Sequence, residues 1–245
     1  MVQCVSSRGI DAALLATDAD AAALPPDVVT KADLYDHLER SLASLIDPDT
    51  DWISSLSNAS SLIYNSLNRF PAWQDKKINW AGFYLLSGIM PSAAASRAKR
   101  SRPTLLLGPF VGLPACQLIF SVPGKGVCAD ASSLLPPRVV RVRDTEAYPN
   151  HIACDSLSRS EIVVPLLLSR SRLSEQHRAA LEAQSPHDGS APTETEDRSW
   201  AARGTDDEII IGVLDIDCEA LDGFDQEDED RLRKLARLIV DRSAW

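Results

Sequence analysis

Three cysteines stand where a thiol can react. Cys128 ends the glycine turn GKGVC, and a helix is expected to begin near Val127. Free backbone N–H groups and the helix dipole at such a position stabilise a thiolate, so the Cys128 thiol is predicted to be reactive. Cys154 lies in the polar segment NHIACDSLSRSE, and Cys116 precedes a predicted strand. The alternative is that each is a small buried hydrophobe, a common fate of free cysteines.

Three carboxylates are placed to share one pocket. Asp215 and Asp217 alternate in the strand-like run LDID, so they point to the same face. Glu161 opens a second strand-like run, SEIVVPLLL, and we expect the two strands to pair. Clustered carboxylates suit a substrate with an ammonium group, and crowding raises the pKa of one acid enough to make it a proton donor. The alternative is that strand-end acids simply face water.

Two aromatic residues accompany these acids. Trp80 and Tyr84 are four positions apart in the strand-like segment INWAGFYLL, so both point to one side. They are predicted either to wall the same pocket or to be ordinary core residues.

Standard sequence signatures of other chemistries are missing. The chain has no GxxxxGKS/T or GxGxxG loop, and no CxxC, HExxH or GxSxG motif. His151 and Cys154 have a spacing that two zinc ligands can have, but no matching second pair follows. No metal and no organic cofactor is therefore expected.

The composition argues against some classes of binding partner. The 245 residues carry a formal net charge of −10, which argues against a nucleic-acid or anionic-membrane surface. No run approaches the length of apolar sequence that a membrane helix needs. The five cysteines are odd in number and widely spaced, unlike a secreted disulfide framework. No targeting signal is evident, so a cytoplasmic location is predicted.

The hydrophobic patterns predict one α+β domain. Short steps between strands favour a central antiparallel sheet, with helices on one face. The domain is placed at 31–245, after a weakly structured leader over 1–30. Two inserted loops interrupt it. The loop at 88–103 is basic, and the loop at 170–206 is predicted to be exposed, apart from a transient helix over Leu173–Ala183. Helices are expected over 31–46, after Asp51, from Val127 and over 224–240, and strands over 79–86, 104–107, 117–122, 139–142, 160–168 and 208–216.

Five segments in this order resemble one enzyme family. They are INWAGFYLL, LLLGPFVGLPACQLI, GKGVC, YPNHIACDSLSRSEIVVPL and IIIGVLDID with the helix that follows it. Together they are similar to the free methionine-R-sulfoxide reductases, which are single-domain enzymes of the GAF fold. The resemblance spans roughly 31–169 and 207–243, and the pairing of HIACDSxSxSE with GVLDID is its most specific part.

The resemblance implies an activity and a role for each candidate. The family reduces the R-epimer of free methionine sulfoxide, without a cofactor, through a cysteine sulfenic acid and a disulfide that thioredoxin recycles. By this resemblance Cys154 is the catalytic cysteine, and Cys116 or Cys128 resolves the sulfenic acid. Homodimers are frequent in the family. The substrate-binding residues that it implies are Glu161, Asp215, Asp217, Trp80 and Tyr84.

Four features depart from the family pattern. The separation of Cys116 and Cys128 is about two residues longer than usual, Ala129-Asp130 replaces a glycine and a small polar residue, and Cys218 replaces a serine. The 170–206 insertion splits a strand pair that is usually joined tightly. Cys4 lies outside the match and, like Cys218, is expected to be a bystander. Two other functions share the fold: a GAF ligand-binding module without catalysis, and a thiol redox sensor without turnover.

Overall fold

One antiparallel sheet organises the chain. The structure is a computed structural model that describes residues 24–90, 103–151, 156–182 and 203–245. Within these residues six strands follow the order β3-β2-β1-β6-β5-β4, which confirms the predicted α+β fold with a central antiparallel sheet. The strands are β1 (Ile78–Leu86), β2 (Thr104–Gly112), β3 (Leu118–Phe120), β4 (Val140–Val142), β5 (Ser160–Ser169) and β6 (Glu208–Cys218).

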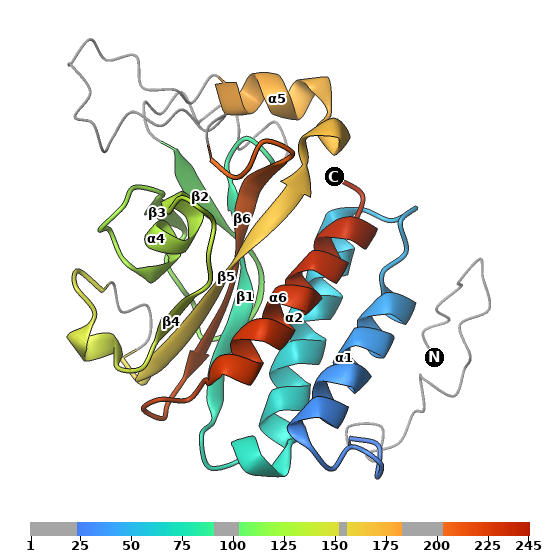
Figure 1. The fold of residues 1–245 in the computed structure, drawn as a ribbon, viewed down its shortest axis with the longest axis vertical. Helices are drawn as coiled ribbons and strands as arrows, with labels where there is room; N and C mark the ends of the chain where they lie inside the picture. The colour runs from blue at the N-terminus through green and yellow to red at the C-terminus, as the bar shows by residue number, and fades with distance from the viewer. Residues whose placement is uncertain (1–23, 91–102, 152–155, 183–202) are drawn as a thin grey trace.

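Helices cover both faces of the sheet. The helices α1 (Lys31–Leu45), α2 (Trp52–Arg69) and α6 (Gln226–Arg242) lie on one face, where α2 packs on β1 and β2 and α6 packs on β5 (Figure 1). The short helix α4 (Val127–Ser133) lies on the opposite face, against β5 and β6 (Figure 1). The expectation of helices on one face only is therefore wrong, and the exception is the helix that carries Cys128.

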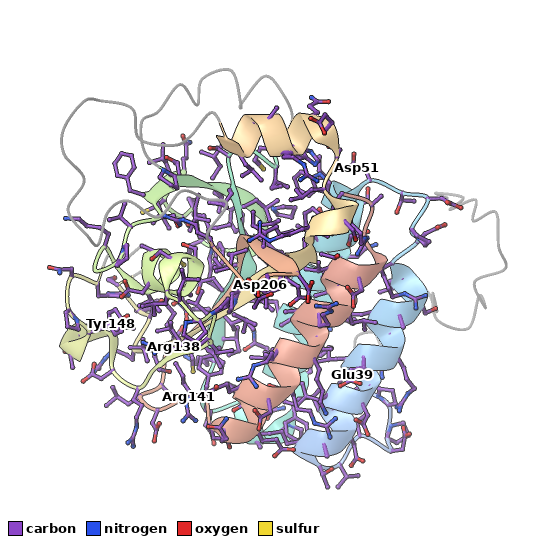
Figure 2. The ribbon with its side chains drawn as sticks, turned by 45° about the horizontal axis from the view of Figure 1, so that its top comes forward. Glu39, Asp51, Arg138, Arg141, Tyr148 and Asp206 are labelled. Carbon is purple, nitrogen blue, oxygen red and sulfur yellow. The ribbon has the colours of Figure 1, made fainter. Side chains whose placement is uncertain are left out.

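Local sequence explains where the long helices begin. Thr30 and Asp225 are the capping residues, and the side chain of each accepts a hydrogen bond from the backbone N–H of the third residue of the helix that follows. That third residue is an aspartate in both helices, and its carboxylate accepts a hydrogen bond from the backbone N–H of the capping residue. This reciprocal pair satisfies N–H groups that have no partner within the helix. Between the two helices, Glu39 of α1 lies 3.6 Å from Arg231 of α6, on the face seen in Figure 2.

The strand β2 is longer than its sequence predicts. The strand predicted over 104–107 continues through Gly108 and Pro109 to Gly112. The register passes from the pair Tyr84–Leu107 to the pair Gly82–Phe110, so two residues of β2 face one of β1. This bulge accommodates the proline, which cannot donate to a ladder.

The described parts of the 170–206 insertion are anchored to the domain. The helix α5 (Glu175–Glu182) occupies most of the stretch expected to be transiently helical, and Leu173 and Leu181 are buried. Arg203 is also buried, and its guanidinium donates to Ser121 and to the carbonyl oxygen of Ser132 at 3.2 Å. The expectation of an exposed segment is wrong at these positions, because two leucines and one arginine find partners in the core. Residues 183–202, most of 1–30 and most of 88–103 lie outside the described residues.

None of the helices in the described ranges is both long enough and apolar enough to cross a membrane.

Candidate active site

The pairing of β5 with β6 gathers the predicted acids. Glu161 lies directly opposite Asp217, and Asp215 lies opposite Val163, one step further along the same face. The three carboxylate residues are 5%, 8% and 6% exposed, respectively. The expectation that the two strands pair is confirmed, and the alternative that these acids face water is excluded.

Cys128 brings a thiol to the same point. Gly126, with a φ of 104°, turns the chain into α4, so that Cys128 is the second residue of the helix. Its Sγ lies 3.2 Å from Oδ2 of Asp215 and 3.9 Å from Oε1 of Glu161. A thiol and two carboxyl groups therefore meet under α4.

Electrostatics in this cluster disfavour negative charge. Burial raises the pKa of Asp215 well above its usual range, and the charge of Glu161 raises it further. Burial, with the charge of Asp217, likewise raises the pKa of Glu161. Burial and the same acids raise the pKa of the Cys128 thiol. The prediction of a thiolate at Cys128 is wrong, because burial among carboxylates outweighs the stabilisation at a helix N-terminus.

Aromatic rings form the adjacent wall. Trp80 pairs with Asp217 across β1 and β6, and its ring stacks on that of Tyr84 with centroids 5.8 Å apart. The Phe110 ring also stacks on that of Trp80, with centroids 5.3 Å apart. Gly112 makes room, because a Cβ at this position would lie 2.5 Å from the Trp80 ring. Trp80 and Tyr84 do face one side, as predicted, and both line a pocket.

His151 is a pocket residue whose position here the sequence did not predict. Its Nε2 lies 3.3 Å from Oε2 of Glu161, and burial lowers the pKa of the imidazole. The available signal was its place three residues before Cys154 in HIAC. The pocket is lined by Trp80, Tyr84, Ala115, Ile119, Lys125, Gly126, Val127, Cys128, Ala129, His151, Ser158, Glu161, Asp215 and Asp217.

Asp130 fixes the segments around the pocket. Its carboxylate accepts hydrogen bonds from the Gly124 N–H and the Tyr148 hydroxyl, both at 2.5 Å. Asn150 donates to the Gly124 carbonyl oxygen at 3.1 Å. Tyr148, labelled in Figure 2, belongs to the segment that ends at His151. The departure at Ala129-Asp130 thus ties the glycine turn to the chain before Cys154.

The remaining cysteines differ in position. Cys116 is half-buried beside the pocket residue Ala115, and its carbonyl oxygen accepts a hydrogen bond from Tyr84 at 3.0 Å. Cys218 follows the pocket residue Asp217 but is not among the residues that line the pocket; it is buried, with its thiol 3.2 Å from the carbonyl oxygen of Lys76. Cys154 and Cys4 lie outside the described residues.

Comparisons with known proteins identify relatives of the chain. No family model matches the chain. The free methionine-R-sulfoxide reductase of Saccharomyces cerevisiae is 34% identical over 86% of this chain and 86% of its own length. The protein of that name from Escherichia coli is 32% identical over 84% of this chain and 87% of its own.

Solved structures give the fold. One described as the structure of the GAF domain has a TM-score of 0.63 and 32% identity, and the match covers 92% of this chain and 96% of the other. Free methionine-R-sulfoxide reductase from Neisseria meningitidis, solved in complex with its substrate, has a TM-score of 0.57 and 30% identity, covering 87% and 90%. The protein is thus a GAF domain with a thiol–carboxylate pocket. It belongs to the free methionine-R-sulfoxide reductases.

Proposed function

We propose that the protein reduces free L-methionine (R)-S-oxide to L-methionine, using thiols as the source of electrons. The observation that carries the proposal is the pocket in which the Cys128 thiol, Glu161 and Asp215 meet beside Trp80. Relatives of that name match most of the chain.

The first step consumes the sulfoxide. The thiolate of Cys154 attacks the sulfoxide sulfur, and the oxygen is transferred to the cysteine as it accepts a proton. Cys154 becomes a sulfenic acid, and methionine leaves as the reduced sulfide. Cys154 is three residues from His151 and four from Ser158, both of which line the pocket.

The pocket acids provide the proton. Since burial raises the pKa values of Glu161 and Asp215, the pair retains a proton at a pH where isolated carboxyl groups have lost theirs. Such a group acts as a general acid towards the sulfoxide oxygen.

Thiol chemistry completes the cycle. A second thiol, Cys116 or Cys128, attacks the sulfenic acid, which forms a disulfide and releases water. Thioredoxin, a dithiol, then reduces that disulfide by exchange and is itself oxidised. One sulfoxide and one dithiol are therefore converted to one sulfide, one disulfide and one water.

The acids also explain the choice of a free amino acid. The substrate's ammonium group is a cation that suits a pocket with the three carboxyl groups of Glu161, Asp215 and Asp217. A methionine sulfoxide residue within a peptide has no such cation. Trp80 adds a donor, because its buried Nε1 has no hydrogen-bond partner among the described residues and can donate to the substrate.

The direct test measures turnover of each epimer. Purified protein with a thiol reductant should consume free methionine-R-sulfoxide and spare the S-epimer. Cys154→Ser should lose activity by about three orders of magnitude or more while it stays folded. The matched control is Cys218→Ser, which removes a buried thiol outside the pocket and should keep activity.

Other results would select another function. Full activity of Cys154→Ser would reject this cysteine as the nucleophile. Tight binding of the sulfoxide without turnover by the wild type would favour a binding module, and oxidation of the cysteines without turnover would favour a redox sensor. Mass mapping of the disulfide after one turnover identifies whether Cys116 or Cys128 resolves. A cytoplasmic location and a homodimer stay predictions.

A further inference from the structure

We propose that the reduced pocket is also a binding site for Zn²⁺, with Cys128, Glu161 and Asp215 as protein ligands, and that the bound ion inhibits the reductase. The three side chains offer one sulfur and two carboxylate oxygens that all lie within 4.8 Å of one another. These three ligands are different residues from the pair His151 and Cys154 that the sequence spacing suggested.

The distances fit a tetrahedral ion. Zinc bonds of about 2.3 Å to sulfur and about 2.0 Å to oxygen, at tetrahedral angles, set a sulfur and an oxygen ligand about 3.5 Å apart. The Sγ of Cys128 lies 3.2 Å from Asp215 and 3.9 Å from Glu161, on either side of that value. Each of the two sulfur–oxygen distances therefore differs from that value by less than about 0.5 Å.

One ligand atom has no hydrogen-bond partner among the described residues. It is Oδ1 of Asp215, a residue that is only 6% exposed and lines the pocket. Buried polar atoms are nearly always paired, with protein or with another species bound in the site. An ion between Asp215, Glu161 and Cys128 gives that carboxylate the charged partner it lacks.

The chemistry of the ligands selects the ion. A thiolate favours zinc over magnesium and calcium, which prefer all-oxygen ligands. His151, 3.3 Å from the second oxygen of Glu161, is placed to hold that carboxylate in orientation. Binding replaces the protons that the crowded groups now retain with a divalent charge, so protons are released as the metal enters. With three protein ligands, one coordination position is left for water.

The consequence for catalysis follows from the shared residues. Zinc on Glu161 and Asp215 occupies the carboxyl oxygens that the proposed mechanism uses to bind the substrate's ammonium group and to protonate its sulfoxide oxygen. Inhibition therefore rests on the proposed function, whereas metal binding does not.

The first experiment measures binding directly. Fully reduced wild-type protein is titrated with zinc chloride against a chromogenic chelator, and the expected result is one ion per chain. Co²⁺ serves as a second probe and should give a thiolate-to-cobalt charge-transfer band. Cys128→Ser should abolish that band, and Cys128→Ser and Asp215→Asn should each weaken zinc binding by at least about 10-fold.

Two variants serve as controls. Cys218→Ser and Cys154→Ser should bind zinc as the wild type does, and circular dichroism checks that every variant is folded. Absence of a stoichiometric ion, or full binding by folded Cys128→Ser, would overturn the site. Loss of binding in Cys154→Ser would overturn it as well, because a different thiol would then be the ligand.

The second experiment measures inhibition. Zinc should lower the turnover of free methionine-R-sulfoxide by the wild type and by Cys218→Ser, and a chelator should restore it. Turnover that is unchanged at a zinc concentration shown to fill the site would overturn the inhibitory part. A wild type that binds zinc but never reduces the sulfoxide would instead contradict the proposed function and leave the metal site supported.

Discussion

Two clusters of acids lie on opposite faces of the sheet, and their buried members are partnered differently. In the helix-layer cluster, Asp228 of α6 receives hydrogen bonds from the Lys31 ammonium at 2.9 Å, the Tyr35 hydroxyl at 2.8 Å and the Asp225 N–H at 2.8 Å. In the pocket cluster, Asp215 and Glu161 lie next to each other. Their other neighbours are the Cys128 thiol and the His151 imidazole, whose pKa is lowered.

Under the proposed mechanism, this difference separates an acid that stabilises the fold from acids that provide protons. Burial raises the pKa of Asp228, but the bonds from Lys31 and Tyr35 oppose that rise. No lysine or arginine is paired with Asp215 or Glu161 among the described residues, so their pKa values rise much further. A compensated buried charge stabilises its surroundings, whereas an uncompensated one keeps a proton available at a cost in stability.

The largest expected effect is on catalysis. Asp215→Asn keeps the shape of the side chain but removes its acidic proton. We expect kcat/KM for the sulfoxide to fall by about 10²–10⁴-fold, while the melting temperature at neutral pH stays the same or rises. Steady-state kinetics and thermal unfolding measure the two quantities.

The matched variant for that comparison is Asp228→Asn, which should keep kcat/KM in the folded protein. An Asp215→Asn protein that loses stability but keeps activity would show that the pocket cluster is structural.

The next effect is on stability. Asp228→Asn leaves the Lys31 ammonium, with only 18% of its side chain exposed, without one of its two carboxylates. Asparagine has one acceptor oxygen in place of two, so the Tyr35 hydroxyl and the Asp225 N–H can no longer bond to separate oxygens of this side chain. We expect the free energy of unfolding in urea to fall by about 3 kcal/mol, as for other buried ion pairs that lose a partner.

Asp230→Asn is the control on the same helix. Its side chain is 53% exposed and pairs with Arg233, so its loss should change stability by no more than about 0.5 kcal/mol. Equal losses in the two variants would contradict the structural role of the helix-layer cluster.

The smallest effect is the pH dependence of stability, which should have opposite sign for Asp215 of the pocket cluster and Asp225 of the helix-layer cluster. Because the pKa of Asp215 is raised in the folded state, its contribution to folding stability is fully present below the unfolded pKa of 3.8. That contribution is lost as pH rises through the folded pKa. For Asp225, burial acts to raise the pKa, but the hydrogen bond from Lys31 outweighs burial and lowers the pKa to about 2. The contribution of Asp225 to folding stability is therefore lost as pH falls from 3.8 through that value.

Melting temperatures across the pH range test this opposition. The melting temperature of the wild type should fall relative to that of Asp215→Asn as pH rises. The melting-temperature advantage of the wild type over Asp225→Asn should shrink as pH falls. Parallel trends for the two variants would mean that Asp215 and Asp225 do not differ in charge compensation.

Much of the site was predictable because motif and strand periodicity are local. Alternation in LDID places Asp215 and Asp217 on one face, and this needs no tertiary information. The end of β2 was predicted too early, since Gly108 and Pro109 form a bulge only when β1 is alongside. Leu173, Leu181 and Arg203 were expected to be exposed because their neighbours are polar, and burial depends on distant partners.

The sequence by itself determined the elements, the α+β class and the residue types that resemble the reductase family. Only the tertiary structure decided the protonation of the pocket. The Cys128 thiol meets Glu161, 33 positions away, and Asp215, 87 positions away. A pKa depends on burial and on charges a few ångströms away in space. A thiol that the local sequence predicts as a thiolate at a helix start is therefore held protonated among carboxylates.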